Sequence, residues 1–235
     1  MSVLRPAAGE TDLAAVGALL ADHARVTMLL TLGDGRTLPA TVLASEAGVA
    51  ASTASYHLTR LVQAGLLKCQ PRGRCRYYGL AGPEVAELIE MLARLAPQRP
   101  VTSLRQGTRA HALRFARSCY DHLAGRLGVA VLDALSAQEL LSGPDGDEPG
   151  IFAVTAKGAE RLGGLCVPAG VRQAARGCLD WTEQRPHLAG KLGRQLLARF
   201  LELGWVVRQP SSRALTLTEL GREALSAELR LTIPA

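Results

Sequence analysis

Apolar residues in the first part of the chain recur at helical spacing, in segments separated by turn-forming residues. The first segment covers residues 12–32, and four of its apolar residues share one face of the helix that it predicts: Leu13, Val16, Leu19 and Leu20. The stretch GDGRTLP then breaks the pattern, because glycine, aspartate and proline favour turns. Pro39 suits the first turn of a second helix, which runs to Ala47 and ends at Gly48.

A third helix is predicted for residues 53–64. Its apolar residues lie at i, i+4, i+7 and i+8 and form a face suited to burial: Ala54, Leu58, Leu61 and Val62. Ser52 is expected to cap the N-terminus of this helix, and Gly65 to end it. Two helices joined by a short turn at Gly48, the second rich in hydroxyl groups, are typical of a helix-turn-helix.

A two-stranded hairpin comes next, since LLKCQ and RCRYYGL have the pattern of strands around the turn Pro71-Arg72-Gly73. Residues 82–97 predict another helix, with an apolar stripe: Val85, Leu88, Ile89, Leu92 and Leu95. A stripe at the end of a small domain favours pairing with a helix of a second subunit. The prolines of APQRPVTS indicate a linker, so we expect one domain over residues 1–98 and another over residues 99–235.

The second domain contains a repeat. CYDHLAGRLG at 119–128 and CLDWTEQRPHLAGKLG at 178–193 share a Cys-x-Asp start and an H-L-A-G-[RK]-L-G end. FAVTAKGAERL at 152–162 likewise matches LTLTELGREAL at 215–225, and the second copy follows a helix–hairpin–helix plan. The sequence therefore predicts a mainly α fold with small β-hairpin wings, in which a winged helix-turn-helix domain precedes two degenerate winged-helix-like repeats.

Composition narrows the class of protein without naming a function. The chain has 235 residues, 48% of them hydrophobic, and it contains no apolar run of about 18 residues, so we expect no membrane-spanning segment. We also find no signal-peptide pattern at the N-terminus. No tight C-x-x-C pair occurs among the five cysteines, which are Cys69, Cys75, Cys119, Cys166 and Cys178. These features indicate a cytoplasmic protein with reduced thiols.

The charge distribution is more informative than the net charge of +6. No carboxylate occurs in the 37 residues between Glu46 and Glu84, although the average for the chain predicts about three there. The same window contains five cations: Arg60, Lys68, Arg72, Arg74 and Arg76. A basic region without acids favours a polyanionic partner.

Double-stranded DNA is the partner that this arrangement predicts. An exposed helix fits the major groove, where hydroxyl, phenol and guanidinium groups contact base edges and phosphates. Arginines on the hairpin would neutralise phosphates beside the major groove. The candidate DNA-binding residues are Ser52, Thr53, Ser55, Tyr56, His57, Arg60, Arg72, Arg74 and Arg76. Two alternatives stay open: His57 packs inside the domain, and one ring of Tyr77 and Tyr78 lies in the core.

The segment LASEAGVAASTASYHLTRLVQAGLLKCQPRGRCRYYGL resembles the winged helix-turn-helix of the ArsR/SmtB family of bacterial repressors. The matching motifs are S-x-x-S-x-H-L from Ser52, L-x-x-A-G-L-L from Leu61 and the wing G-R-x-R-Y-Y from Gly73. The resemblance covers roughly residues 12–96, and Ala50 stands where the family often has serine. It implies a homodimer, paired through terminal helices of this domain, that binds an operator inverted repeat and releases it when an effector binds.

Neither familiar metal motif of that family is present. LPATVLASEAG lacks the cysteines of a C-V-C motif, and PEVAELIEMLARL lacks histidine, so metal sensing is not implied by the resemblance. Cys69 and Cys75 flank the wing turn, and we expect them to be cross-strand neighbours beside arginines that favour thiolate. They are candidates for a redox-sensitive disulfide, and the alternative is a pair of small strand residues.

The repeat supplies a second set of candidate ligands. Cys119 and His122 lie at i and i+3, which we interpret as one face of a helix, and Cys178 and His187 are their counterparts. The two copies together could complete a Cys2His2 site for a metal ion or contribute to a small-molecule effector site. The alternative is structural, with each histidine capping a helix or bonding the aspartate of its own copy.

Sequence motifs typical of enzymes are missing. The chain contains no phosphate-binding glycine loop, no G-x-S-x-G and no H-E-x-x-H. We therefore expect a regulator without enzymatic activity. A helix-turn-helix that serves only as a protein-interaction module is the alternative.

Overall fold

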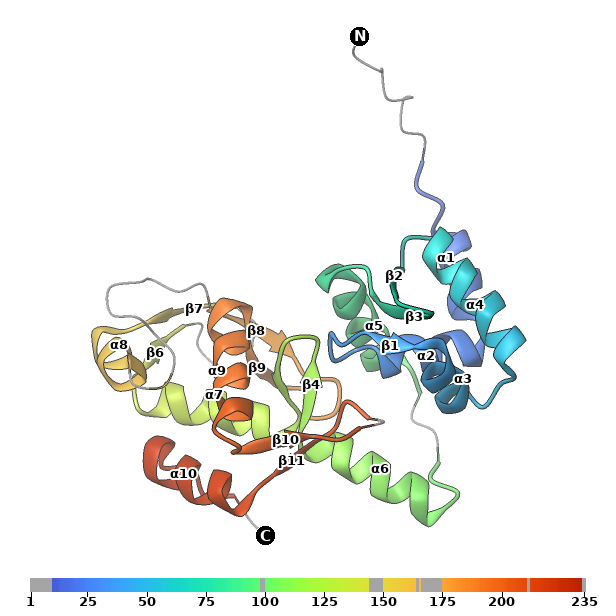
Figure 1. The fold of residues 1–235 in the computed structure, drawn as a ribbon. Helices are drawn as coiled ribbons and strands as arrows, with labels where there is room; N and C mark the ends of the chain where they lie inside the picture. The colour runs from blue at the N-terminus through green and yellow to red at the C-terminus, as the bar shows by residue number, and fades with distance from the viewer. Residues whose placement is uncertain are drawn as a thin grey trace.

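The computed structural model describes residues 10–97, 100–143, 150–163, 165, 175–210 and 212–233. Figure 1 shows a helical N-terminal half (residues 10–97) beside a C-terminal half (residues 100–233) that mixes helices with short hairpins. The elements of the N-terminal half are α1 (Leu13–Leu20), α2 (His23–Thr31), β1 (Leu38–Pro39), α3 (Ala40–Ala47), α4 (Ala51–Gln63), β2 (Leu67–Arg72), β3 (Cys75–Leu80) and α5 (Pro83–Leu95). The winged helix-turn-helix fold predicted from the sequence is confirmed.

The first predicted helix is in fact two helices. The axes of α1 and α2 differ by 89°, because the chain turns at Ala21 and Asp22. The Asp22 carboxylate caps α2 by accepting a hydrogen bond of 3.0 Å from the Arg25 amide. No single helix in the described ranges is long and apolar enough to cross a membrane. Among the described helices, only α1 and α2 taken together, as a bent pair, have the length and apolar composition of a membrane span.

The helix-turn-helix consists of α3 and α4. Gly48 ends α3 with a left-handed conformation at φ 67°, which glycine adopts without strain. The N-cap of α4 is Ala50, which makes no side-chain capping bond, so the prediction that Ser52 caps this helix was wrong. Ser52 lies within the first turn because α4 begins at Ala51. The predicted apolar face is confirmed for Ala54, Leu58 and Leu61, which are fully buried.

The wing is the β2–β3 hairpin within a sheet of order β1-β3-β2. Arg72 pairs with Cys75, so the turn consists of Gly73 and Arg74 rather than Pro71, Arg72 and Gly73. Gly73 has φ 60°, as expected in a two-residue hairpin loop. The predicted hairpin is therefore confirmed, but its turn lies closer to the C-terminus than the sequence pattern indicated.

In the C-terminal half, α6 is followed by two series of hairpin, helix, hairpin and helix. The elements are α6 (Leu104–Phe115), β4 (Arg117–Cys119), β5 (His122–Ala124), α7 (Arg126–Ala137), β6 (Leu141–Ser142), β7 (Ile151–Val154), α8 (Ala156–Gly163), β8 (Ala175–Leu179), β9 (Pro186–Ala189), α9 (Gly190–Glu202), β10 (Val206–Arg208), β11 (Leu215–Leu217) and α10 (Glu219–Leu229). Strands β6, β7, β8 and β9 form one antiparallel sheet in that order, which joins the two series.

Equivalent residues of the two copies make equivalent contacts. Thr155 and Thr218 each accept a hydrogen bond of 2.9 Å from the amide three residues later, at Gly158 and Gly221. Each threonine hydroxyl also donates to a backbone carbonyl two residues beyond the preceding long helix, at Glu139 after α7 and at Gly204 after α9. The internal repeat thus extends to hydrogen bonds, while the description of each copy as winged-helix-like stays a prediction.

Two hydrophobic cores fill the described chain. One contains residues between Leu19 and Ile89, and the other contains residues between Ala116 and Leu229. The halves meet where the turn after α2 approaches the first C-terminal hairpin: the Tyr120 amide donates to the Gly33 carbonyl over 2.7 Å. The domain boundary at residues 98 and 99 stays a prediction, since those residues are outside the described ranges.

Candidate DNA-binding surface and a buried cysteine–histidine tetrad

The exposed side of α4 carries the polar residues singled out from the sequence. Ser52, Thr53, Ser55, Tyr56 and Arg60 are all exposed. The Arg60 Nη1 atom donates to the Tyr56 hydroxyl over 3.2 Å, and the guanidinium lies 5.8 Å from the centre of the tyrosine ring. These residues form a polar, positively charged surface along one helix, whose contact with DNA stays a prediction.

His57 does not belong to that surface. It is 7% exposed, and its Nδ1 atom lies 3.3 Å from Nη1 of Arg25 on α2. The Nε2 atom is 3.9 Å from a carboxylate oxygen of Asp22. The prediction of a DNA contact for His57 was therefore wrong, because the periodicity of α4 turns position 57 towards α2, beside Ala54, Leu58 and Leu61.

The wing presents three arginines. Arg72, Arg74 and Arg76 are exposed, and the Arg72 guanidinium lies 5.0 Å from the ring centre of Tyr77. Tyr78 is buried, so one of the two tyrosine rings belongs to the core, as one of the sequence alternatives held. None of the three wing arginines, nor Arg60, forms an ion pair with a carboxylate of the described chain. Their charges are available to an external anion.

The two wing thiols are not cross-strand neighbours. Cys69 pairs with Tyr78 and Cys75 pairs with Arg72, so they lie three positions apart along the ladder and on opposite faces of the hairpin. Three residues of strand span about 10 Å, whereas a disulfide requires Cα atoms within about 7 Å. The hypothesis of a redox-sensitive Cys69–Cys75 disulfide was therefore wrong, because the two-residue turn shifts the register.

Four residues of the repeat meet in the C-terminal half. The ligand atoms of Cys119, His122, Cys178 and His187 all lie within 4.8 Å of one another, and we call these residues the Cys–His tetrad. Cys119 and His122 face each other across β4 and β5, and Cys178 and His187 across β8 and β9. The interpretation of residues 119–122 as a helix was wrong, because Tyr120 at φ 56° makes a tight hairpin turn. Cys166 lies outside the described residues.

Three residues of the tetrad are buried, Cys178 is half-buried, and each histidine lies beside a carboxylate. The two imidazole rings stack with centres 5.1 Å apart. The Nδ1 atom of His122 lies 3.1 Å from Asp121, and that of His187 lies 3.3 Å from Asp180, so each histidine contacts the aspartate of its own copy. The hydrogen bond with Cys178, together with burial, raises the pKa of the Cys119 thiol to about 12. In the metal-free state this thiol is therefore protonated and a poor nucleophile.

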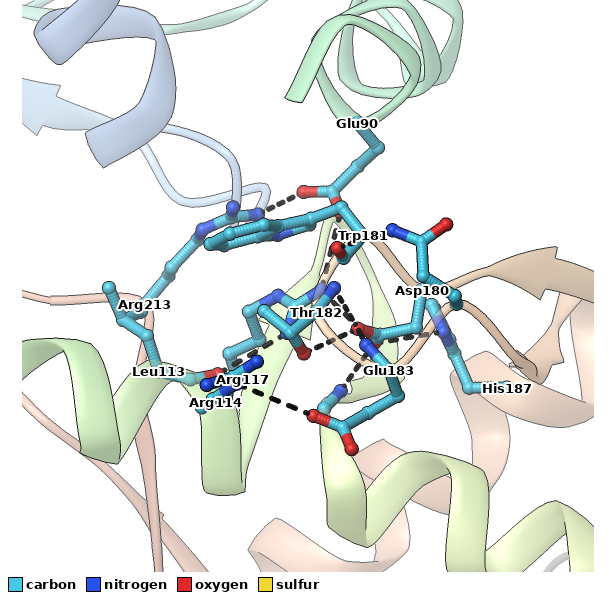
Figure 2. Close-up of polar contacts among 12 residues, drawn as sticks. Glu90, Leu113, Arg114, Arg117, Asp180, Trp181, Thr182, Glu183, His187 and Arg213 are labelled. Carbon is cyan, nitrogen blue, oxygen red and sulfur yellow. Dashed lines mark hydrogen bonds and ion pairs between the residues drawn. The ribbon is translucent and has the colours of Figure 1, made fainter. Parts of the chain in front are cut away.

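A chain of buried charges connects the tetrad to the N-terminal half, as Figure 2 shows. Asp180, which contacts His187, also lies 3.0 Å from the fully buried guanidinium of Arg117. Arg117 lies 3.5 Å from Glu90 on α5, and Arg213 forms a second ion pair with the same carboxylate. Burial opposes ionisation of Glu90, but Arg213 and Arg117 hold its pKa below the usual range.

Other contacts fix Asp180 and Arg117 in position. The Asp180 carboxylate accepts hydrogen bonds from the Gly125 amide over 2.7 Å and from the Thr182 hydroxyl over 2.7 Å. The Trp181 ring centre lies 5.0 Å from the Arg117 guanidinium. His187 and Arg117 offset the burial of Asp180 and hold the pKa of its carboxyl well below the usual range. Asp180 is therefore ionised and accepts from both copies of the repeat.

Glu90, Arg117 and Arg213 were not identified from the sequence. Each stands alone among apolar or small residues, in IEML, FARSC and SSRAL. A single charge in an apolar strand or helix indicates a buried partner, but it does not say which residue that partner is. The pairs join residues more than twenty positions apart, so only the fold brings them together.

Comparison with known proteins agrees with the geometry of α3, α4 and the wing. Residues 20–70 match the model of a family described as a helix-turn-helix domain. The chain is 41% identical over 227 residues to the HTH-type transcriptional regulator YdfF of Bacillus subtilis (strain 168), and the match covers 94% of this chain and 99% of the relative. The chain therefore belongs to the HTH-type transcriptional regulators, and its N-terminal half contains their DNA-binding domain.

Solved structures similar to part of the chain include two from other bacteria. Reduced HlyU from Vibrio cholerae N16961 is 29% identical, and the match covers 36% of this chain and 88% of that chain with a TM-score of 0.33. The homodimeric winged helix-turn-helix DNA-binding domain of Mb0332 from Mycobacterium bovis is also 29% identical, and covers 37% of this chain and 88% of that chain with a TM-score of 0.32.

Proposed function

We propose that the protein is a homodimeric repressor of the ArsR type that binds an operator inverted repeat and is released by an effector. The observation that carries this proposal is the exposed polar side of α4 beside a wing whose arginines have no carboxylate partner in the described chain. Elsewhere in the described residues many arginines are paired, including Arg36, Arg117 and Arg213. Four cations without a carboxylate partner in the described chain, Arg60, Arg72, Arg74 and Arg76, thus lie where a DNA duplex would bind.

In the proposed complex, α4 enters the major groove and the wing lies along the adjacent backbone. Ser52, Thr53 and Ser55 occupy the first turns of α4, where hydroxyl groups contact bases or phosphates. The wing arginines neutralise phosphates, and the release of counterions makes affinity strongly dependent on salt. Arg72 and Arg76 stand on the strands beside the turn, and Arg74 stands in the turn itself.

Exposed apolar residues support pairing of two copies through α5. Met91, Leu92 and Leu95 lie near its C-terminal end, and Leu95 is 83% exposed. Leu13 on α1 is also largely exposed. Exposed apolar side chains grouped on one helix favour an interface between protein chains. A twofold dimer would present two α4 helices to two half-sites, which is the reason for proposing an inverted repeat.

The proposed function requires no catalysis and places the protein in the cytoplasm, where bacterial operators are found. The hydrogen bond with Cys178 and burial raise the pKa of the Cys119 thiol, which argues only against this cysteine acting as a nucleophile. A further role for the C-terminal half, as the part that receives the effector, is consistent with the buried connection from Asp180 to α5.

The proposal is tested by measuring fluorescence anisotropy with DNA from the region upstream of the protein's own gene, because repressors of this kind commonly bind there. A shuffled duplex of equal length serves as the non-specific competitor. We expect operator binding at least about a thousandfold tighter than binding to the shuffled duplex. Equal affinity for both, or no binding, would favour the alternative of a protein-interaction module.

Replacement of one wing arginine tests the geometry. Arg74→Ala should weaken binding to every duplex and lower the slope of log affinity against log salt by about one, because one phosphate contact is lost. Lys157→Ala on α8 is the matched control, since it removes one exposed cation from the C-terminal half. Equal salt slopes for wild type and Arg74→Ala would remove the wing from the DNA interface.

A further inference from the structure

We propose that Cys119, His122, Cys178 and His187 hold one Zn²⁺ ion in a closed tetrahedral site between the two repeats. Their ligand atoms lie within 4.8 Å of one another, while sulfur and nitrogen ligands of tetrahedral zinc are roughly 3.3–3.8 Å apart. The four residues come from the facing strands of two hairpins, and β5 and β9 lie side by side. Small rotations of the side chains would therefore close the tetrad around the ion.

The histidines are prepared for coordination through their Nε2 atoms. The Nδ1 atom of His122 is hydrogen-bonded to Asp121, and the Nδ1 atom of His187 lies 3.3 Å from Asp180. In the neutral ring these carboxylates favour a proton on Nδ1, which leaves Nε2 free to bind a metal ion. Both Nε2 atoms are buried and have no hydrogen-bond partner among the described residues. A buried imidazole nitrogen without a partner is unfavourable, and a metal ion at the centre of the tetrad would satisfy both at once.

The ligand types select the class of ion. Two thiolates and two imidazoles in a tetrahedral arrangement suit Zn²⁺, whereas Mg²⁺ and Ca²⁺ require oxygen ligands. All four positions are supplied by the protein, so the site has no open position for a reacting water. We therefore assign a structural or signalling role to the ion rather than a catalytic one.

The internal repeat explains why the site has four ligands. Each copy contributes one cysteine and one histidine, so neither copy could form the site alone. Gly128 and Gly193 permit the approach of the copies: a Cβ atom at Gly128 would lie 3.4 Å from Cβ of His187, and one at Gly193 would lie 3.3 Å from Cβ of His122. The ion would join the two repeats across their near-symmetric contact.

The ion would also act on the DNA-binding half, and this part of the inference rests on the proposed function. Coordination of His187 fixes the imidazole that contacts Asp180, and Asp180 in turn holds Arg117 against Glu90 on α5. Because α5 carries the exposed apolar residues of the proposed dimer interface, its position affects the spacing of the two α4 helices. We expect the zinc-loaded dimer to bind the operator more tightly than the zinc-free dimer.

The site is tested on the full chain, purified under reducing conditions without added metal. Mass spectrometry and metal analysis should find about one zinc per chain, and Co²⁺ titrated into the stripped protein should give the absorption bands of tetrahedral cobalt with thiolate ligands. Cys178→Ser should lose the stoichiometric ion and the thiolate band. Asp121→Asn, which removes only the carboxylate behind His122, should weaken Zn²⁺ binding by about 10–100-fold.

The wing cysteines supply the matched control. A Cys69→Ser/Cys75→Ser double variant removes two exposed thiols of the wing that do not belong to the tetrad, and it should bind Zn²⁺ and Co²⁺ as the wild type does. The proposal is overturned if the stripped wild type gives no tetrahedral cobalt spectrum or if the double variant loses the ion. It is also overturned if Cys119 and Cys178 remain joined by a disulfide in protein purified under reducing conditions. Circular dichroism of each variant separates loss of ligand from loss of fold.

The connection to α5 is tested by operator affinity with and without zinc. Loaded wild type should bind the operator at least about fivefold more tightly than stripped protein, and Cys178→Ser should show no such difference. Glu90→Gln should still bind Zn²⁺ but lose the difference, while Glu87→Gln on the same helix should keep it. If Glu90→Gln does not fold, Arg213→Lys tests the same contact.

Failure of the zinc site and failure of the proposed DNA-binding function give different results. Normal zinc binding with no operator binding in either state overturns the proposed function and leaves the metal site in place. Operator binding without stoichiometric zinc overturns the metal site and leaves the proposed function in place. Zinc binding with equal or reversed operator affinities overturns only the connection through Asp180, Arg117 and Glu90.

Discussion

At the scale of single residues, the most instructive position is His57. The Arg25 guanidinium beside it also donates to the carbonyls of Leu19 and Ala18, over 2.6 and 2.9 Å. One buried arginine thus connects the end of α1, the start of α2 and the middle of α4. His57 is therefore held by an internal contact and lies on the buried side of α4 with Leu58, whereas its other neighbour, Tyr56, is exposed.

His57→Ala should lower the free energy of unfolding by about 1–3 kcal/mol, because it leaves a buried guanidinium nitrogen without its partner. The salt slope of operator binding should not change. Urea denaturation and anisotropy titrations measure the two quantities. Thr59→Ala, at an exposed position on the same helix, is the control and should change stability little. A reduced salt slope for His57→Ala would return this residue to the DNA interface.

The sequence predicted correctly whether some residues of α4 are exposed or buried, but not others. Helical periodicity placed Thr53, Tyr56 and Arg60 on the exposed side correctly, because side chains three and four apart share a face. Periodicity also contained the information for His57, whose spacing from Ala54 and Leu61 puts it near the buried face. The sequence nevertheless left both alternatives open for His57, because the chemical type of histidine also suits a contact with DNA. Chemical type therefore predicted less than position on the helix.

At the scale of elements, turns were harder to predict than faces. Asp12 to Leu32 has continuous apolar spacing, and the break between α1 and α2 depends on one carboxylate cap at Asp22. The hairpin at residues 117–124 turns through Tyr120 and Asp121, without the glycine or asparagine that usually marks such a turn. By contrast, the last helix of the helix–hairpin–helix plan predicted for the second copy is present as α10, and the Thr218 side chain caps it by accepting from the Gly221 amide.

The close approach of α9 to the β8–β9 hairpin requires glycine at position 193. A Cβ atom at Gly193 would lie 2.3 Å from the Leu188 carbonyl oxygen, which is backbone and cannot move aside. Gly193→Ala should therefore destabilise the protein by about 1–3 kcal/mol or more. Gly17→Ala is the control, since nothing lies within 4 Å of its Cβ position in α1, and it should be neutral or slightly stabilising. Thermal melting compares them, and equal melting temperatures would contradict this packing.

At the scale of the whole molecule, the two halves are joined by buried charges rather than by a continuous apolar core. Glu90 on α5 pairs with Arg117 and Arg213 of the C-terminal half, and all three side chains are buried. Such a contact is specific, because each charge needs its particular partner, and it is strongly destabilised when one partner is removed. The sequence could not reveal it, since local patterns carry no information about partners in the other half.

Glu90→Ala should lower the free energy of unfolding by about 3–5 kcal/mol, because two buried guanidinium groups lose their carboxylate. Glu87→Ala, one turn earlier on α5, breaks only the exposed pair with Arg176 and should cost at most about 1 kcal/mol. Urea denaturation followed by circular dichroism measures both. Similar small losses for the two variants would show that the halves are held together by other contacts.

The position of α5 affects how a dimer of this protein would respond to binding of the ion. One side of the helix carries Glu90, and Leu92 and Leu95 near its end are exposed. In a dimer paired through this helix, a displacement of α5 in one subunit would be transmitted across the symmetry axis to the other subunit, since the two α5 helices would pack against each other. Binding of the ion to one subunit would then change the affinity of the other subunit for the ion. Operator binding would therefore depend more steeply on ion concentration than it would for a single independent site.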